Sequence, residues 1–155
     1  MKMFLQKIAA LLYGMVIRVR NTLFDKDILK GVEFNIPIVC IGNITAGGTG
    51  KTPMVELMVS HFSKSRNVAV LSRGYKRKTK GYKVVDTFDN YIDVGDEPLQ
   101  IKRKFPHIPV IVCENRVAGI NRIRQEFKDV NMIIMDDGFQ HRWVKPYLNI
   151  VMIDY

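Results

Sequence analysis

A glycine-rich segment near residue 50 carries the residue types and spacing of a phosphate-binding loop. It reads Gly47-Gly48-Thr49-Gly50-Lys51-Thr52-Pro53 and follows an apolar run. Its glycines let successive N–H groups point inward, and a helix that begins near Thr52 directs the positive end of its dipole to the same place. Lys51 would reach the β- and γ-phosphate oxygens, and the Thr52 hydroxyl would bind Mg²⁺. The predicted nucleotide-binding residues are Thr45, Ala46, Gly47, Gly48, Thr49, Gly50, Lys51 and Thr52.

One position departs from the strict GxxxxGK(S/T) pattern of such loops. Thr45 stands where the pattern has its first glycine, so a glycine-rich turn followed by a chance Lys-Thr pair is the alternative interpretation. Pro53 in a first helical turn gives up no hydrogen bond, which supports a helix start here. A strand before the segment and a helix after it are the context that phosphate loops require. We therefore favour nucleotide binding.

Two adjacent carboxylates, Asp136 and Asp137, follow an apolar run at residues 132–135. The carboxyl ends of parallel strands meet at the sheet edge that also carries the phosphate loop, so either carboxylate could hold Mg²⁺ directly or through water. We interpret the pair as a Walker B element, with Asp137 also a candidate catalytic residue, although Asp-Asp-Gly is also an ordinary turn. His141, shortly after it, could contact nucleotide or substrate, or serve as a structural hydrogen-bonding residue.

A second acidic pair, Asp96 and Glu97, lies where a helix is predicted to begin. Acidic residues at a helix N-terminus often act only as caps. Phosphoryl transfer to an alcohol, however, needs a group that positions the hydroxyl and accepts its proton, and an Asp that is not bound to metal can do this. Asp96 is our candidate for that base.

Basic residues outnumber acidic ones, 24 to 15, for a net charge of +9. This excess suits nucleic acid, an acidic membrane surface or a phosphorylated substrate. Residues 61–85 hold much of it, and there Arg73 and Tyr75 follow a predicted strand, which places them near the ligand edge or in a solvated loop. Arg116, after another strand, could stabilise charge on a transferred phosphoryl group or form a helix-capping salt bridge.

Short apolar runs alternate with helical stretches from residue 36 onward. We predict strands at residues 36–41, 68–71, 108–113, 132–135 and 150–153, helices at 52–63, 97–104 and 116–127, and a possible extra strand at 82–85. Buried Val/Ile runs between helices indicate βαβ units, so the predicted fold is α/β, with a mostly parallel sheet of the P-loop NTPase type and helices on both faces. Because nothing follows 150–153 to cover a central strand, we expect a longer protein, an edge strand or pairing with another chain, and favour the first.

The composition, 47% hydrophobic and 25% charged, is that of a globular protein and argues against disorder, collagen and low-complexity architectures. Cys40 and Cys113 lie in apolar runs without the spacing of a disulfide framework, which favours a reducing, cytoplasmic setting. Residues 8–17 are uncharged, but a bilayer span needs about 20 residues. One face of a helical wheel instead carries Phe4, Leu5, Ile8, Leu11, Leu12, Met15, Val16 and Val19. This apolar face predicts an interfacial amphipathic helix within residues 1–30, or a helix that packs on its own domain.

Several of these segments together resemble the tetraacyldisaccharide 4′-kinase family of lipid A biosynthesis. They are Gly42-Asn43-Ile44-Thr45, Gly47 to Pro53, Ser72-Arg73-Gly74-Tyr75, Gly95-Asp96-Glu97-Pro98, Asn115-Arg116, and Asp136-Asp137-Gly138-Phe139-Gln140-His141. Their order and spacing match along the chain, and Thr at the first-glycine position is how that family's loop reads. The family is about twice as long, and its later half supplies a smaller lobe and a His that assists the catalytic Asp.

The resemblance implies a kinase that uses ATP and Mg²⁺ to phosphorylate the 4′-hydroxyl of a tetraacylated glucosamine disaccharide 1-phosphate, forming lipid IVA. It implies base catalysis by Asp96, catalytic roles for Lys51 and Asp137, and metal binding by Thr52, Asp136 and Asp137. The substrate-binding residues it suggests are Arg73, Tyr75, Arg116, Gln140 and His141. Residues 1–30 would associate with the cytoplasmic face of a Gram-negative inner membrane, and residues 31–155 would form the kinase domain, without a nucleic-acid partner.

Two other hypotheses fit the residues alone. In the first, the chain is a P-loop ATPase that acts with nucleic acid or a protein partner, and residues 61–85 grip a phosphate backbone. In the second, it is a non-catalytic module that folds only with a partner.

Overall fold

The computed structural model describes residues 2–43, 50–138 and 141–153, with side chains of the first helix from residue 14 onward. Within these ranges, six strands form one sheet in the order β3-β4-β2-β5-β1-β6. The strands are β1 (Ile38–Asn43), β2 (Val68–Ser72), β3 (Lys83–Val84), β4 (Val110–Val112), β5 (Met132–Asp136) and β6 (Leu148–Met152). All neighbouring pairs are parallel except β3 with β4.

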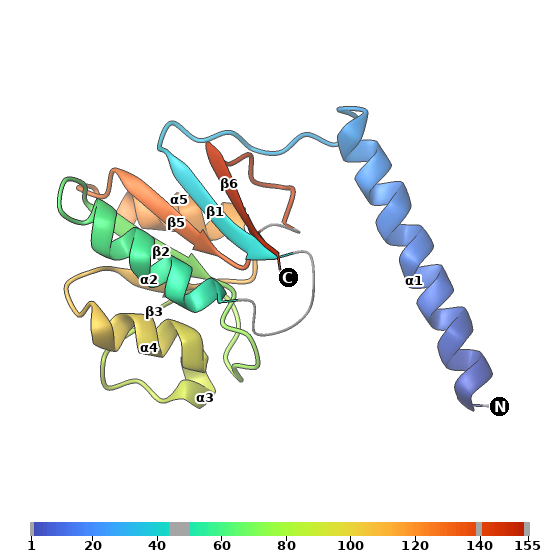
Figure 1. Cartoon of the computed structure of the whole chain (residues 1–155), viewed down its shortest axis with the longest axis horizontal. Helices are drawn as coiled ribbons and strands as arrows, with labels where there is room; N and C mark the ends of the chain where they lie inside the picture. The colour runs from blue at the N-terminus through green and yellow to red at the C-terminus, as the bar shows by residue number, and fades with distance from the viewer. Residues whose placement is uncertain (1, 44–49, 139–140, 154–155) are drawn as a thin grey trace. The chain divides into compact units, whose positions relative to one another are not determined.

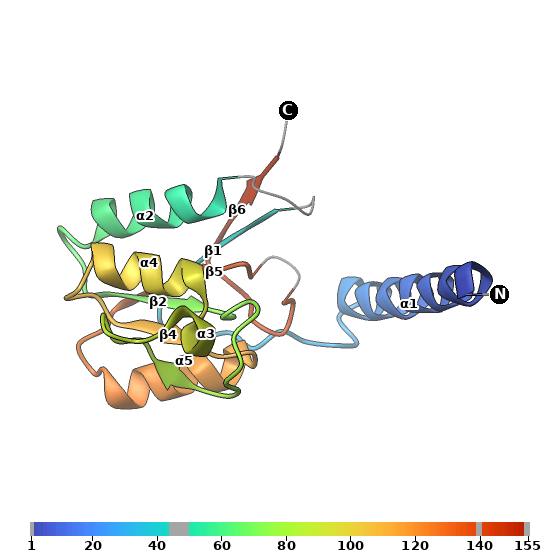
Figure 2. The same cartoon turned by 90° about the horizontal axis from the view of Figure 1, so that it is seen from below.

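Helices precede the sheet and connect its strands (Figure 1). They are α1 (Lys2–Asp25), α2 (Lys51–Phe62), α3 (Tyr91–Val94), α4 (Asp96–Lys104) and α5 (Arg116–Glu126). Figure 2 shows α2 and α4 on one face of the sheet and α5 on the other. Parallel strands need such crossovers, and the helices bury both faces of the sheet.

Alternate residues of the four inner strands pack into two separate hydrophobic layers, one on each face of the sheet. Along β1, Val39 and Ile41 pack in the layer that contains Val55 of α2, whereas Ile38 and Cys40 pack in the layer on the α5 side. The same period of two holds in β2, β4 and β5, as expected for strands covered on both faces. The sheet is therefore a rigid support for whatever its carboxyl edge carries.

The sheet places the strand that leads to the glycine-rich segment next to the strand that ends in the Asp136-Asp137 pair. β5 pairs with β1 in a register that sets Asp136 opposite Ile41, two residues before β1 ends at Asn43. The chain that leaves β1 and the chain that leaves β5 thus emerge at the same edge. Loops at the carboxyl edge of such sheets are where ligands bind.

The predicted α/β fold, with a mostly parallel sheet covered on both faces, is confirmed. The strand at the C-terminal apolar run is the last one in the order of the described strands, so β6 lies at an edge of the described sheet, which is one of the alternatives that the sequence left open. One helix, α3, was not predicted from the sequence. The short helix α3 begins at the Asn90 cap, whose side chain accepts a hydrogen bond from the Ile92 amide, and four residues give no periodic signal.

Residues 1–31 form one compact unit and residues 32–155 another. The first unit is dominated by α1, in which Met15, Val16 and Val19 are exposed. These three side chains belong to the apolar face predicted from the sequence. No helix among the described residues has both the length and the apolar character needed to cross a membrane.

Candidate active site at the carboxyl edge of the sheet

The first turn of α2 forms one wall of the site. Gly50 caps the helix in the left-handed conformation, with φ 78°, which favours glycine, and Lys51 and Thr52 follow as the first helical residues. The free amides of this turn and the helix dipole favour an anion at this end. The predicted loop residues Thr45, Ala46, Gly47, Gly48 and Thr49 lie outside the described residues.

Asp137, which follows β5, forms an ion pair with the first residue of α2. The Lys51 Nζ lies 3.9 Å from an Oδ atom of Asp137, and the Gly138 amide donates to the Ile41 carbonyl at 3.2 Å. Asp137 itself has φ 50°, a conformation that Asp tolerates better than most residues. The turn after β5 therefore holds a carboxylate directly beside the lysine of the glycine-rich segment.

Asp136 is a buried carboxylate, 1% exposed. Its Oδ2 accepts a hydrogen bond from the Ser72 hydroxyl at 3.3 Å, while Oδ1 has no partner among the described residues. Burial, and then the nearby Glu97 and Asp137, raise the pKa of Asp136 to about 6, against the opposing effects of Arg116 and Ser72. An unpaired oxygen on a buried carboxylate is unfavourable by itself and suits a bound cation.

Glu97 is a site residue that the sequence interpretation left without a role. Burial, followed by the charge of Asp96, raises its pKa, whereas Lys51 and a hydrogen bond with the Thr52 side chain oppose the rise. Asp137 also acts on it, so Glu97 faces the α2 turn and the β5 end together. The sequence feature that could have identified Glu97 is the Asp96-Glu97 pair. The sequence alone does not tell which member of the pair points toward the glycine-rich segment.

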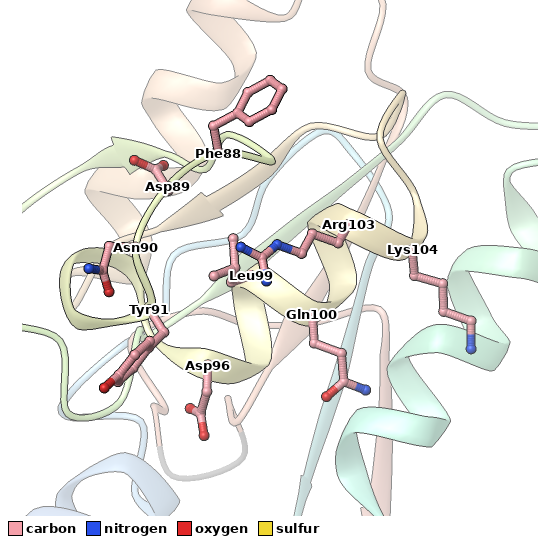
Figure 3. A pocket seen from close by; sticks show the side chains of 9 residues that line it. All are labelled: Phe88, Asp89, Asn90, Tyr91, Asp96, Leu99, Gln100, Arg103 and Lys104. Carbon is pink, nitrogen blue, oxygen red and sulfur yellow. The ribbon is translucent and has the colours of Figure 1, made fainter.

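Asp96, the candidate base, is the exposed first residue of α4. It lies at the rim of a surface cavity of about 920 Å³ that also contacts Tyr91 and Leu99 (Figure 3). The two members of the acidic pair therefore have different surroundings: Glu97 is engaged with Lys51 and Thr52, and Asp96 borders open space.

Gly95, just before Asp96, packs against the loop after β2. Its φ of 91° is a glycine conformation, and an added Cβ would lie 3.3 Å from the Gly74 Cα. The backbone of the Ser72-Arg73-Gly74-Tyr75 segment thus touches the residue that precedes the candidate base.

Arg77 ties the same loop to the end of β4. Its side chain is 2% exposed, and its guanidinium donates to Glu114 at 2.7 Å and to the Gly81 carbonyl. The Gly81 amide also donates to Glu114, at 2.9 Å. One of the cations at residues 61–85 is consequently part of the fold and not open to an anionic partner. Lys76, Lys78 and Lys80 of this loop are exposed.

The remaining predicted residues lie in different settings. Arg73 and Tyr75 are exposed after β2, and the Lys76 ammonium lies 5.2 Å from the centre of the Tyr75 ring. Arg116 is 2% exposed and donates to the Cys113 and Asp136 carbonyls, and its own amide donates to His141 Nε2 at 3.2 Å. Gln140 lies outside the described residues.

Burial lowers the pKa of Arg116 to about 10, with Asp136 and Asp137 acting in the opposite direction. The guanidinium still carries its charge at neutral pH. Because it bonds the carbonyls of Cys113 and Asp136, it joins the ends of β4 and β5 and sets the direction in which the chain leaves β5.

The geometry fits a magnesium nucleotide. Among the described residues, no group of three His, Cys, Asp or Glu side chains would hold a metal by itself. Mg²⁺ is usually bound by one or two carboxylates together with substrate phosphates and water, so a closed protein cage is not needed. The unpaired Asp136 Oδ1, the Thr52 hydroxyl and the Lys51 ammonium at a helix N-terminus supply a suitable set.

A glycine-capped helix start beside a carboxylate-tipped parallel strand defines the class of P-loop nucleotide-binding proteins. The comparisons with known proteins narrow this class. The family model described as Tetraacyldisaccharide-1-P 4′-kinase matches residues 1–155, so the chain belongs to that family. The resemblance noted from the sequence motifs is confirmed.

Curated relatives and a solved structure agree with this assignment. The tetraacyldisaccharide 4′-kinase of Porphyromonas gingivalis strain W83 is 53% identical over 146 residues, covering 93% of this chain and 41% of the relative. The tetraacyldisaccharide 4′-kinase of Parabacteroides distasonis is 48% identical over 145 residues, covering 92% of this chain and 39% of the relative. The crystal structure of LpxK from Aquifex aeolicus in complex with ATP matches with a TM-score of 0.82 and 38% identity, over 90% of this chain and 45% of that one. The chain thus spans about two fifths of the length of these relatives.

Proposed function

We propose that this chain is the nucleotide-binding part of a kinase that transfers the γ-phosphoryl group of ATP to the 4′-hydroxyl of a tetraacylated glucosamine disaccharide 1-phosphate. The product would be lipid IVA, in lipid A biosynthesis. The observation that carries the proposal is the convergence of Lys51, Thr52, Glu97, Asp136 and Asp137 at one sheet edge. The names of the family and its curated relatives supply the acceptor.

Each residue at this edge has a role that its position supports. Lys51 would hold the β- and γ-phosphate oxygens, and Asp137, 3.9 Å from it, would orient its ammonium. Thr52 and Asp136 would hold Mg²⁺, with Asp137 able to do so directly or through water and Glu97 close enough to contribute. When bound, MgATP supplies the phosphoryl group and neutralises charge that develops on its oxygens.

Asp96 borders the cavity and would act on the acceptor. Its carboxylate accepts the proton of the 4′-hydroxyl as the hydroxyl oxygen forms its bond to the γ-phosphorus, and the bridging oxygen leaves with ADP. Glu97 cannot share this role while it is engaged with Thr52 and Lys51. The division of labour follows from the two directions in which the pair faces.

The other family residues would support the site at its border. Arg73 and Tyr75 are exposed beside the segment that touches Gly95 and would contact the acceptor. The Arg116 amide donates to His141 Nε2, and these two residues would fix the exits of β4 and β5 and so place the substrate groups. Gln140 is proposed as a further acceptor contact on the basis of the family motif.

Calorimetric titration of the 155-residue chain with MgATP tests the nucleotide site. Charge-assisted hydrogen bonds contribute about 1.5–3 kcal/mol, so Lys51→Ala should weaken binding roughly ten- to hundredfold. Lys64→Ala, an exposed lysine in the turn after α2, is the matched control. Equal affinities for Lys51→Ala and the control would contradict the proposal.

Turnover is measured in a protein of the relatives' full length that carries these 155 residues. Asp96→Ala should abolish transfer to the disaccharide acceptor and leave MgATP affinity within about twofold, because Asp96 lies outside the Lys51–Thr52–Glu97 contacts. Near-normal turnover by this variant would remove Asp96 as the base.

We also propose that residues 1–30 associate with the cytoplasmic face of the inner membrane of a Gram-negative bacterium and that residues 31–155 form the kinase domain. The exposed Met15, Val16 and Val19 support an interfacial helix. Replacing all three with Gln should reduce co-sedimentation with vesicles that contain anionic lipid, whereas Leu57→Gln, an exposed apolar residue of α2, should not. Binding should also weaken in high salt. Equal sedimentation of both variants would contradict the membrane role.

A further inference from the structure

Helices α2 and α4 lie side by side on one face of the sheet (Figure 1 and Figure 2). The helix α2 begins with Lys51 and Thr52, and α4 begins with the acidic pair Asp96 and Glu97. Because Thr52 and Glu97 share a hydrogen bond, the two helix N-termini meet at the candidate active site. A slide of one helix along the other would separate the Glu97 carboxylate from the Thr52 hydroxyl.

Glu56 joins the same two helices further along their length. Its Oε2 accepts a hydrogen bond from Lys104 Nζ at 2.5 Å, and its Oε1 accepts one from Gln100 Nε2 at 2.9 Å. Both carboxylate oxygens are thus engaged with α4, and the Glu56 side chain is 13% exposed. The hydrogen bond from Lys104 lowers the pKa of Glu56, burial opposes this and Gln100 supports it, so the group is ionised at neutral pH.

The residues of these contacts share one face of each helix. On α2, Glu56 follows Thr52 by four positions, and on α4, Gln100 and Lys104 follow Glu97 by three and seven positions. Residues at such spacings lie above one another on a helix. The Thr52–Glu97 contact and the two contacts of Glu56 therefore form one row along the α2–α4 interface. Only the first contact of this row lies in the candidate active site.

The contacts of Glu56 contribute more to geometry than to stability. Lys104 is 55% exposed, and salt bridges with an exposed partner contribute little to the free energy of unfolding. Gln100 and Lys104 lie on successive turns of α4, so a single carboxylate that holds both restricts how far α4 can slide or rotate. A displacement of about 1 Å in a catalytic constellation can reduce a rate about a hundredfold, so this restriction is significant for the site.

We infer that Glu56 is a positioning residue of the candidate active site: its contacts with Gln100 and Lys104 hold α4 where the Glu97 carboxylate meets Thr52. The inference rests on the proposed function, in which Thr52 would hold Mg²⁺ and Glu97 is close enough to contribute. It adds a residue outside the site that determines how the two helix N-termini meet. Glu56 acts through Glu97, because both of its oxygens are engaged with α4.

A double-mutant cycle, measured by calorimetric titration of the 155-residue chain with MgATP, tests this role. Glu97→Ala should weaken MgATP binding about tenfold, and Glu56→Ala about fivefold, because Glu97 is then no longer held at Thr52. The two substitutions together should weaken binding no more than Glu97→Ala alone. A merely structural loss at Glu56 would instead multiply with the loss at Glu97.

NMR spectra of the ligand-free chain supply a measurement that does not depend on the nucleotide. Glu56→Ala should shift the backbone amide signals of Thr52 and Glu97. Glu56→Gln should shift them less, because its amide oxygen can still accept from Lys104. Lys104→Ala removes the same contact from the α4 side, so it should shift the same signals and weaken MgATP binding several-fold.

Glu126→Ala is the matched control. Like Glu56, Glu126 accepts hydrogen bonds from two side chains, Tyr82 at 2.9 Å and Arg122 at 2.8 Å, but it lies in α5 on the opposite face of the sheet. Its replacement should leave MgATP affinity within about twofold and the amide signals of the candidate site unmoved. Both Ala variants should keep a urea midpoint close to that of the unaltered chain, because each loses contacts at the surface.

The outcomes separate this inference from the proposed function. If Lys51→Ala weakens MgATP binding as expected but Glu56→Ala behaves like the control, or its loss multiplies with that of Glu97→Ala, only the inference fails. A urea midpoint much lower for Glu56→Ala than for the control would also overturn it, because Glu56 would then serve stability. If the unaltered chain does not bind MgATP, the nucleotide site fails, and the amide signals alone decide whether Glu56 positions Glu97.

Discussion

A comparison of the Asp136→Asn variant with the unaltered chain measures how much the buried carboxylate at the candidate magnesium site lowers the free energy of unfolding. The ordinary pKa of the group is 3.8, and burial, together with Glu97 and Asp137, raises it to about 6. Each unit of pKa difference between folded and unfolded states corresponds to about 1.4 kcal/mol. The ionised Asp136 therefore lowers the free energy of unfolding by about 3 kcal/mol at neutral pH. No solvent screening reduces this figure, because the side chain is buried.

The sign of the pH dependence follows from the direction of the shift. Between about pH 4 and pH 6 the folded chain holds the Asp136 proton and the unfolded chain releases it, so the free energy of unfolding falls as pH rises through this window. Above the window the loss is complete and constant. An Asn at this position does not titrate, so the variant lacks this decline, whatever constant offset its amide introduces.

Urea denaturation of the two proteins from pH 4 to pH 8, with EDTA present, gives the difference curve. We expect the stability of the Asn variant relative to the unaltered chain to rise by about 3 kcal/mol across the window and then to level off. Asp129→Asn, at an exposed turn, controls for the removal of one carboxylate. Saturating Mg²⁺ should shift the rise to lower pH, since a bound cation favours the ionised form. A flat difference curve, or one of opposite slope, would refute the assignment of a buried, unpaired carboxyl.

Three further substitutions test the packing that positions the site, each by urea denaturation. Gly95→Ala should cost about 2 kcal/mol, because of its positive φ and the contact with Gly74; an unchanged midpoint would show that the backbone is not held there. Arg77→Met should cost about 2–3 kcal/mol through the lost bonds to Glu114 and its neighbours, with Arg77→Lys intermediate; equal stability of both variants would contradict the clamp. Gly138→Ala should cost about 1–3 kcal/mol by overpacking, and no loss would mean that the β5 turn has room.

The sheet was predictable because its strands are buried on both faces. Such strands appear as continuous Val/Ile runs, and the strands predicted at residues 36–41, 68–71, 108–113, 132–135 and 150–153 all overlap observed strands. Residues 150–153 show the limit of that signal. An edge strand against β1 and a central strand have the same apolar composition, so only pairing partners distinguish them.

The residue types of the site were predictable, but their directions were not. Lys51, Thr52 and Asp137 were assigned from the spacing of motifs, and the structure brings Lys51 and Asp137 to 3.9 Å. The acidic pair at α4 is different, because two adjacent residues at a helix start can face opposite sides. Which of them meets Thr52 depends on how Gly95 lets the chain enter α4 with a φ of 91°. The Gly95 backbone is packed against Gly74, which lies 21 positions earlier in the chain, so the entry into α4 involves a tertiary contact that local sequence does not reveal.

The negative charge of the carboxylates at this site is only partly compensated by the residues around them. Asp136 has an oxygen without a partner, and Glu97 is held near two other carboxylates, so both pKa values rise. Lys51 offsets only part of this repulsion. A divalent cation with its nucleotide would supply the missing positive charge and the phosphate ligands for the α2 turn in a single binding event. The burial and repulsion of these carboxylates lower the free energy of unfolding of the ligand-free chain. A cation that binds only the folded chain relieves this repulsion and stabilises the fold by mass action.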